Sequence, residues 1–325
     1  MENSSTTEND GCSLQPTAQY TIGIVICGAG ILGNLAFMFV VFRVASMRII
    51  PNAYLVNLAI ADLLHLLIHQ VFWFTYVFGG NITNQVVRCM LFFIVRISQY
   101  VSMFTVTMLS IERFLALCRP LTYRNGVIHK KMFVAFMIFL IWFVSTAVTA
   151  EAFYDCFSPS AIRSLPGQIF YIVSLFTLML LVLVVYILII RQVKQSSQAV
   201  RNKEKQIVRV CLATALVYFL CMLPSVTNAI FTVMIAEHPW IQLDINLACL
   251  LNVSNYFLEV NSAVNPLIYT TMSSNYRRAF KKAFMCSPYK LAGPRGATRM
   301  TAGESTNVGM ETSVSYRTDT KQTHL

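Results

Sequence analysis

Ionisable and amide side chains stand at several positions inside stretches that are otherwise almost wholly apolar. Glu112 and Arg113 lie at the end of one such stretch, and Asp62 lies in the middle of another. A charged group is costly in a lipid bilayer unless it has a partner, so each of these residues is a candidate for function. We expect Glu112 and Arg113 to form an ionic contact that can be broken. The alternative is that Arg113 has no functional role and belongs to a basic flank that anchors a helix at the lipid headgroups.

Hydroxyl and amide side chains occur at spacings that would bring them to Asp62. Ser98 and Ser102 are four residues apart and share one face of a helix, as do Asn261 and Asn265. Neutral oxygens around one carboxylate suit a small hard cation that keeps part of its water shell. Two states of Asp62 stay open, a carboxylate that binds such a cation and a protonated acid.

Arg96 and Glu259 form a second acid–base set within the apolar stretches. An unpaired arginine in a membrane is costly, so one reading is that these two residues pair with each other. The other reading is that one or both bind a carboxylate or an amine of a ligand. Further residues expected to line the same ligand pocket are His69, Trp73, Val95, Gln99 and Met222.

The elements that must position these residues are membrane-spanning helices. The 325 residues are 56% hydrophobic and 12% charged, which is about half the charged fraction of a typical soluble protein. A hydrocarbon core about 30 Å thick needs about 20 apolar residues per helix. We expect such spans near 20–42, 52–77, 89–118, 131–153, 167–191, 204–235 and 244–271. The sequence therefore predicts an all-α membrane protein with a seven-transmembrane helix bundle.

The positive charge of the chain marks one side of the membrane. The formal charge is +11, but nearly every Lys and Arg outside the spans lies in the alternate connections 43–51, 119–130 and 192–203 or in the C-terminal region. Arg88 and Arg163 are the exceptions. Cytoplasmic segments carry such an excess of basic residues. We therefore expect a multi-pass plasma-membrane protein with its N-terminus outside, and no nucleic-acid partner.

Four segments follow from this orientation. They are an extracellular N-terminal segment (1–19), the bundle (20–272), a short amphipathic eighth helix (273–286) and a disordered cytoplasmic tail (287–325). The eighth helix is expected to lie on the inner leaflet, in contact with membrane lipid.

Several residues outside the bundle are candidates for modification or docking. Asn3 and Asn81 begin glycosylation triplets on the outer side. Cys286 lies just past the amphipathic helix, where it is either acylated or a free thiol. Thr323 and Leu325 match a C-terminal ligand for PDZ domains, although so short a match also arises by chance. Cysteines within the spans are expected to pack as small apolar residues.

Several motifs stand together in a fixed order. They are Gly33-Asn34-Leu35, Leu58-Ala59-Ile60-Ala61-Asp62, Glu112-Arg113-Phe114 and Asn265-Pro266-Leu267-Ile268-Tyr269. With them, residues 20–286 resemble the rhodopsin-like (class A) G-protein-coupled receptor family. The resemblance implies a non-enzymatic receptor whose partners are a heterotrimeric G protein, arrestin and receptor kinases. The inner half is most similar to small-neuropeptide receptors, such as those for thyrotropin-releasing hormone and ghrelin.

The resemblance also implies roles for individual residues. Arg113 would engage the G protein, and Pro266 and Tyr269 would belong to a switch at the inner end of the last helix. Cys89 and Cys156 would form a disulfide. The resemblance implies no cofactor apart from Na⁺ as an allosteric ion. The implied sodium site consists of Asp62, Ser98, Ser102, Asn261 and Asn265.

A switch follows from the positions of the inner charges. Arg113 can pair with Glu112 and, across the bundle, with Glu204, which would lock a closed inner face. The alternative for Glu204 is a solvated charge among neighbouring basic residues. Tyr186 and Tyr269 are placed to hold the open state.

The residues expected in the outer half of the bundle narrow the class of ligand but do not identify it. Val95 stands where monoamine receptors have aspartate, and Glu259 stands where opsins have lysine. Met222 replaces the tryptophan of the family, two residues before Pro224. We expect an extracellular ligand of the small-neuropeptide class, with a chemosensory, lipid or small-acid receptor as the alternative. A transporter or channel would show inverted repeats, and a membrane enzyme would show clustered His or carboxylate residues; neither pattern is found in the sequence.

Overall fold

The computed structural model describes residues 16–78, 80, 82–127, 130–157, 165–195, 198–237 and 247–285. Within these ranges every regular element is a helix. They are α1 (Pro16–Arg43), the short 3₁₀ helix η1 (Ala45–Met47), α2 (Ile50–Val77), α3 (Gln85–Cys118), α4 (Pro120–Asn125), α5 (Lys131–Phe157), α6 (Leu165–Gln195), α7 (Gln198–Glu237), α8 (Leu247–Met272) and α9 (Ser274–Phe284). The predicted all-α class is confirmed.

Seven of these helices are long enough to cross a bilayer. Among the described residues, α1, α2, α3, α5, α6 and α7 also have the apolar composition of membrane spans. The remaining long helix, α8, has 26 residues but carries Glu259 and several asparagines. Large apolar side chains such as Leu32, Phe139 and Leu267 are more than 60% exposed. Exposed apolar surface on this scale fits contact with lipid rather than with water.

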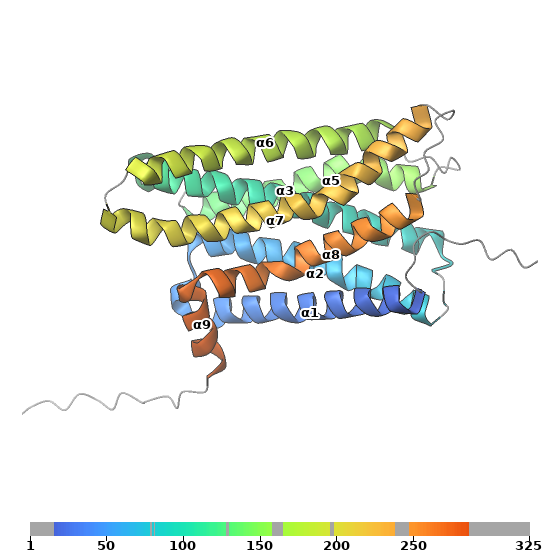
Figure 1. The fold of residues 1–325 in the computed structure, drawn as a ribbon, viewed down its shortest axis with the longest axis horizontal. Helices are drawn as coiled ribbons and strands as arrows, with labels where there is room; N and C mark the ends of the chain where they lie inside the picture. The colour runs from blue at the N-terminus through green and yellow to red at the C-terminus, as the bar shows by residue number, and fades with distance from the viewer. Residues whose placement is uncertain are drawn as a thin grey trace, which may run out of the picture. The chain divides into compact units, whose positions relative to one another are not determined.

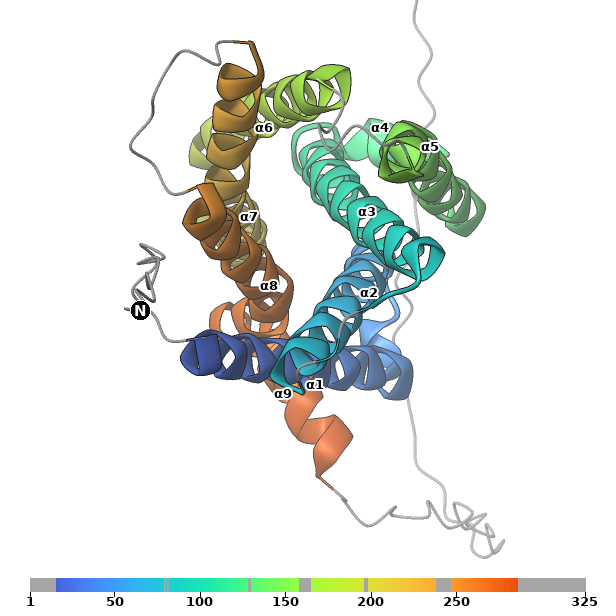
Figure 2. The same ribbon diagram turned by 90° about the vertical axis from the view of Figure 1, so that its right-hand side faces the viewer.

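The long helices run side by side along the bundle (Figure 1), and most of them form a ring when the bundle is viewed from its end (Figure 2). Neighbours around the ring are α1, α2, α3, α6, α7 and α8, and α8 closes the ring against α1. Helix α5 lies outside the ring, against α3 and α2. Side chains from α3, α6, α7 and α8 therefore face a shared interior, in which the functional residues are collected.

The contact between α1 and α8 is unusually close. A Cβ atom added to Gly30 would lie 2.7 Å from Cβ and 2.9 Å from Cα of Ala263. Asn34, one turn further along α1, donates to the carbonyls of Gly30 and Ser262, both at 2.9 Å. The glycine lets the backbones approach, and the asparagine side chain then bridges them.

Two helices extend beyond the predicted membrane spans. The apolar windows of α1 and α7, Ala18–Arg43 and Arg209–Ile235, lie close to the predicted spans 20–42 and 204–235. Helix α1 includes Pro16, and proline is favoured in the first turn of a helix. Of the predicted connection 192–203, residues 192–195 belong to α6 and residues 198–203 belong to α7.

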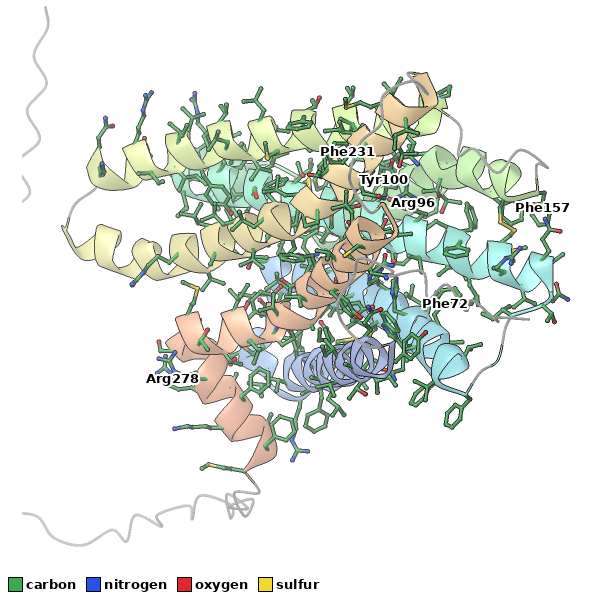
Figure 3. The ribbon with its side chains drawn as sticks, turned by 45° about the vertical axis from the view of Figure 1, so that its right-hand side comes forward. Phe72, Arg96, Tyr100, Phe157, Phe231 and Arg278 are labelled. Carbon is green, nitrogen blue, oxygen red and sulfur yellow. A yellow bond between two sulfur atoms is a disulfide. The ribbon has the colours of Figure 1, made fainter. Side chains whose placement is uncertain are left out.

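Helix α9 turns away from the end of the bundle (Figure 1) and packs against α8 and α1. Its buried side carries Ala279 and Ala283, and its bases, among them Arg278 (Figure 3), are exposed. Tyr276 donates to the side chain of Asn52 on α2. Helix α9 has the amphipathic character predicted for 273–286, although it ends at Phe284.

Candidate functional site

The functional candidates gather at three levels of the bundle. We call the end at which α1 begins the outer end and the opposite end, near α9, the inner end. At the inner end, Arg113 Nε lies 3.3 Å from Glu112 Oε2 on the same helix. The Glu112 side chain is 1% exposed and that of Arg113 is 16% exposed. Both charges are thus largely removed from water, and a buried ion pair is screened much less than an exposed one.

A third residue holds this pair. Tyr123 on α4 donates its hydroxyl to Glu112 Oε1 at 2.7 Å, which is the short distance of a charge-assisted hydrogen bond. Partial burial and the hydrogen bond to Glu112 raise the pKa of the Tyr123 hydroxyl above its usual range. The phenol is therefore a proton donor throughout the physiological pH range.

Arg113 faces a cavity of about 720 Å³ at the inner end, which is also lined by Leu109, Cys211 and Tyr269. The Tyr269 ring is buried against Phe37, with ring centres 5.1 Å apart. The cavity lies beside the end of α9 that joins α8, since Ser273, Ser274 and Tyr276 also line it. Burial raises the pKa of Tyr276 as well.

The remaining inner-end candidates are distributed around Arg113. Tyr186 on α6 is 3% exposed, and its hydroxyl accepts from Ser110 Oγ at 3.5 Å. Phe114 packs against the apolar core between α3, α6 and α7. Pro266 lies within α8, beside Gly33 of α1. Glu204 is in the helical part of α7, but its side chain lies outside the described residues.

In the middle of the bundle Asp62 is fully buried and is bound by neutral groups. Asn265 Nδ2 donates to one carboxylate oxygen at 2.8 Å, and Ser102 Oγ donates to the other at 3.4 Å. Ser98 instead donates to the Val95 carbonyl on its own helix. Ser98 and Asn261 line a small cavity with Ser102 but make no hydrogen bond to Asp62 in the structure.

Ser98, Ser102 and Asn261 line a cavity of about 10 Å³ together with His65 and Met222, which is about the room that one water molecule needs. The carboxylate has no basic partner among the described residues. One acid with neutral oxygens nearby fits a small monovalent cation, so the chain has the donor set that a sodium ion would use. Bound there, the ion would supply a positive charge to Asp62.

Glu259 lies between α1, α2 and α8. Its Oε1 atom accepts from Trp73 Nε1 at 2.7 Å and lies 3.0 Å from Nδ1 of His69. The carboxylate is 0% exposed. Tyr256, one turn earlier on α8, stacks on Trp73 with ring centres 5.5 Å apart, which fixes the indole that binds Glu259.

Of the two readings for Arg96 and Glu259, the one in which they pair with each other is wrong. Arg96 contacts Gln99 Oε1 at 3.4 Å, and its guanidinium lies 4.9 Å from the ring centre of Tyr171 on α6. Arg96 and Tyr100, which are one turn apart on α3, lie inside the bundle (Figure 3). The two charges thus have different neighbours, Arg96 toward α6 and Glu259 toward α2.

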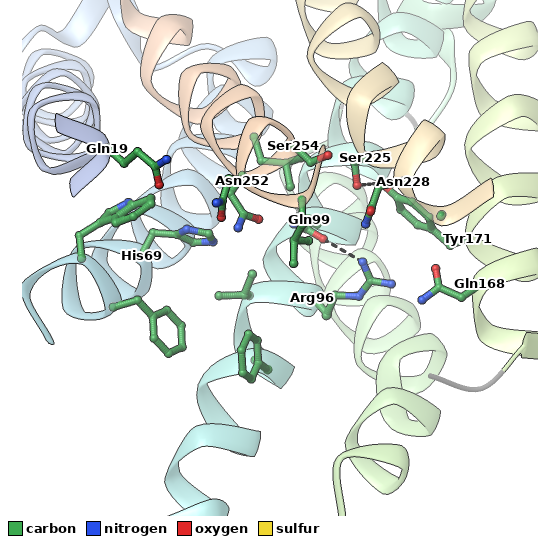
Figure 4. A pocket seen from close by; sticks show the side chains of 18 of the residues that line it. Gln19, His69, Arg96, Gln99, Gln168, Tyr171, Ser225, Asn228, Asn252 and Ser254 are labelled. Carbon is green, nitrogen blue, oxygen red and sulfur yellow. Dashed lines mark hydrogen bonds between the residues drawn. The ribbon is translucent and has the colours of Figure 1, made fainter. Parts of the chain in front are cut away.

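Between them is an outer cavity of about 440 Å³ (Figure 4), within the size range of small-ligand sites. Five of the predicted pocket residues line it, namely His69, Trp73, Val95, Arg96 and Gln99. Two predicted members do not. Glu259 is covered by Trp73 and His69, and Met222 lines the smaller cavity in the middle of the bundle.

The outer cavity contains residues that the sequence analysis did not select. Gln168 and Tyr171 come from α6, and Ser225 and Asn228 come from α7. The Tyr171 hydroxyl lies 3.1 Å from Ser225 Oγ. The available signal was Pro224, which lies within one turn of Ser225 and Asn228, because a proline inside a helix removes a backbone hydrogen bond and kinks the helix.

The predicted disulfide between Cys89 and Cys156 is present, and it joins α3 to the last turn of α5 with Cα atoms 5.8 Å apart. Cys249 is also disulfide-bonded, so the expectation of simple packing is wrong for it. Cys27, Cys211 and Cys221 are free thiols. The candidates Asn3, Asn81, Cys286, Thr323 and Leu325 lie outside the described residues.

Comparisons with known proteins agree with this architecture. Residues 33–269 match the family model described as 7 transmembrane receptor (rhodopsin family). Somatostatin receptor type 2 of Mus musculus is 27% identical over 91% of this chain and 84% of its own length. The thyrotropin-releasing hormone receptor of Mus musculus is 25% identical over 88% and 86%, respectively. Pinopsin of Columba livia is 26% identical over 86% and 82%.

Proposed function

This chain belongs to the rhodopsin family of seven-transmembrane receptors, and we propose that it converts the binding of an extracellular small neuropeptide into activation of a heterotrimeric G protein. One observation carries the proposal. Arg113 faces an inner cavity of about 720 Å³ while it is held by the buried carboxylate of Glu112. A cation held in this way is available to a partner once the restraint is broken.

The proposed activation is a shift between two populations of the bundle. In the closed state Glu112 holds Arg113, and Tyr123 holds Glu112. Glu204 is a second proposed partner of Arg113 in this state. In the open state Arg113 leaves Glu112 and binds carbonyl oxygens of the G protein, while Tyr186 and Tyr269 support its new position.

A sodium ion at Asp62 would favour the closed state. Asn265 on α8 and Ser102 on α3 already meet at this carboxylate. A cation that binds Asp62 and neutral oxygens from both helices holds the helices together. The proposed site consists of Asp62, Ser102, Asn261 and Asn265, with Ser98 at its margin.

The proposed ligand class has two sources of support. The relatives include receptors named for somatostatin and for thyrotropin-releasing hormone. The outer cavity is lined by many amide side chains, such as Gln19, Gln99 and Asn252, which can bind the amide groups of a peptide. A receptor for a lipid or a small acid is the second candidate, because Arg96 in the same cavity favours an acidic ligand.

The wider setting follows the same proposal. The N-terminus is extracellular, with Asn3 and Asn81 glycosylated, and the protein is in the plasma membrane. The C-terminal region faces the cytoplasm, where Cys286 is acylated. There receptor kinases and arrestin act on the tail, and a PDZ domain binds Thr323 and Leu325.

The test is nucleotide exchange on purified G proteins, measured with membranes that contain the chain. Short peptides, small acids and lipids are added separately. We expect at least one peptide to raise exchange and Arg113→Ala to abolish the response at equal surface expression. A response to lipids or acids alone would reject the peptide class. Exchange that never exceeds that of empty membranes with any G protein would reject the receptor mechanism.

A further inference from the structure

Arg96 is a cation without an acidic partner among the described residues. Its contacts are the Gln99 amide oxygen at 3.4 Å and the face of the Tyr171 ring at 4.9 Å, and neither neutralises a full positive charge. An arginine at this depth of a bundle is costly unless an anion meets it. The cavity that it lines supplies room for such an anion.

Glu259 does not serve as that anion. Its Oε1 atom is bound by Trp73 and by His69, and its side chain is 0% exposed. His69 lies across the outer cavity from Arg96 (Figure 4). The negative group is thus covered on one side of the cavity, and the positive group is open on the other.

The guanidinium is held in place before any ligand arrives. Tyr171 presents its ring face to Arg96, and its hydroxyl lies 3.1 Å from Ser225 Oγ on α7. Tyr100 meets the Tyr171 ring edge-on, with centres 6.2 Å apart. The contact with the ring face uses none of the N–H groups, and only Nη1 contacts Gln99. Other N–H groups of the guanidinium are therefore left for the planar, two-point contact that a carboxylate makes.

Asn228 adds a second requirement. It lines the same cavity and is 7% exposed, and its Oδ1 atom has no hydrogen-bond partner among the described residues. Figure 4 shows Asn228 and Gln168 beside the Arg96 guanidinium. A buried acceptor without a donor is unfavourable, so the missing partner is an N–H or O–H group close to the anion.

We propose that the outer cavity binds a ligand carboxylate at Arg96 and an adjacent N–H group at Asn228. These two groups occur together in an acylated amino acid, either as the free C-terminus of a peptide or as a small N-acyl amino acid. The inference rests on the proposed function only in taking this cavity as the ligand site. It deepens that function by naming an acidic ligand, in contrast to one with a C-terminal amide.

The cavity also has an apolar part that could bind an apolar group of the ligand. Phe72 on α2 and Phe92, one turn before Arg96 on α3, line the same cavity and stack with ring centres 5.3 Å apart, and Trp73 lines it too. A hydrophobic side chain that follows the carboxylate would contact these rings. An apolar body with a small number of fixed polar contacts is the usual composition of a small-ligand site.

The first experiment uses the full-length protein in detergent and measures its melting temperature. The probes are N-acetyl-phenylalanine, its carboxamide, and 3-phenylpropanoate, which has the carboxylate but lacks the N–H group. A ligand that binds the folded state alone raises the melting temperature. We expect N-acetyl-phenylalanine to raise it most, 3-phenylpropanoate less, and the carboxamide least.

Variants connect these effects to residues. Arg96→Gln should weaken binding of the acid at least about 30-fold, because it removes the charged partner of a buried carboxylate. Arg96→Lys should keep part of the affinity, which shows that the variant site is folded. Arg88→Gln is the matched control, since Arg88 is an exposed arginine on the same helix outside the cavity. Asn228→Ala should reduce the advantage of N-acetyl-phenylalanine over 3-phenylpropanoate.

Equal effects of the acid and the carboxamide, no effect of any acid, or a preference that survives Arg96→Gln would each overturn the proposal. Glu151, Asp155 and Asp244 have side chains outside the described part of the chain. If the acid preference appeared only after one of them was neutralised, an internal carboxylate would occupy Arg96, and the proposal would be wrong for the native chain.

A second experiment separates the two ligand sources and the two proposals. Short peptides are synthesised in pairs, with a free C-terminus or a C-terminal amide, and are compared with N-acyl amino acids in the nucleotide-exchange assay. A response to free-acid peptides alone identifies a peptide terminus, and a response to N-acyl amino acids alone identifies a small acid. Acid-dependent stabilisation without any nucleotide exchange would reject the signalling function and leave the carboxylate site standing.

Discussion

Replacing Glu112 with glutamine removes the charge that faces Arg113 and keeps the size of the side chain. In the structure the two charged groups lie 3.3 Å apart, and Glu112 is 1% exposed. If the open state requires Arg113 to leave Glu112, this substitution destabilises the closed state more than the open one. We therefore expect Glu112→Gln to raise signalling in the absence of any ligand.

The size of the effect can be worked out from the geometry. Two unit charges at this separation attract by about 5 kcal/mol at an effective dielectric constant of about 20, and desolvation offsets much of that. Arg113 Nε and Glu112 Oε2 form no hydrogen bond with each other, so the charges alone supply the net attraction. We take a net value of about 1.5 kcal/mol, the low end of the range for interactions of charged groups. This is about a tenfold change in the ratio of the open to the closed state. A resting open population of about 1% would rise to about 10%.

The assay is ligand-independent nucleotide exchange on purified G protein, divided by the amount of receptor at the surface. Tyr123→Phe is a graded companion, because it deletes only the 2.7 Å hydrogen bond to Glu112 and should raise basal exchange less. Leu121→Ala is the control, since Leu121 is 72% exposed on the same short helix. Unchanged basal exchange in both Glu112→Gln and Tyr123→Phe would refute the idea that this pair holds the closed state.

Three further predictions concern stability and ions. Gly30→Ala should destabilise the protein by about 1–3 kcal/mol, seen as a lower melting temperature, because the added Cβ would clash with Ala263. Gly28→Ala is the control and should be neutral or stabilising, because no atom lies within 4 Å of the added Cβ. Cys89→Ser should cost about 4 kcal/mol by opening a cross-link between residues 67 apart, seen as lost surface expression. Asp62→Asn should abolish the inhibition of basal exchange that we expect when sodium replaces choline in the buffer.

Much of the architecture could be predicted from the sequence, because a bilayer imposes simple rules on length and hydropathy. The described helices lie close to the expected spans, and the predicted contact of Asp62 with Ser102 and Asn265 is found. The spacing of residues along the sequence assigns their side chains to one face of a helix. Where the faces of α2, α3 and α8 must meet, this assignment is enough to predict which side chains contact one another.

The sequence could not supply the choice between two neighbours on the same level. Arg96 and Glu259 lie at similar depth, so charge alone suggested a pair, but α3 turns Arg96 toward Tyr171 and α8 turns Glu259 toward Trp73. Tyr123 was missed because no pattern shows that the short helix after α3 folds back on Glu112. The extracellular location of the N-terminal segment, the PDZ ligand at the C-terminus and the disorder of the tail stay predictions.

The length of α7 has a mechanical consequence. Its 40 residues, Gln198–Glu237, extend over about 60 Å at 1.5 Å per residue, about twice the thickness of the hydrocarbon core. Pro224 lies inside the helix, beside the cavity residues Ser225 and Asn228. The 26 residues from Gln198 to Leu223 form an arm of about 40 Å. A tilt of about 10° at the proline would move the far end of that arm by about 7 Å. A ligand that shifts the side chains next to Pro224 only slightly would therefore produce a large displacement at the inner end, as a lever does.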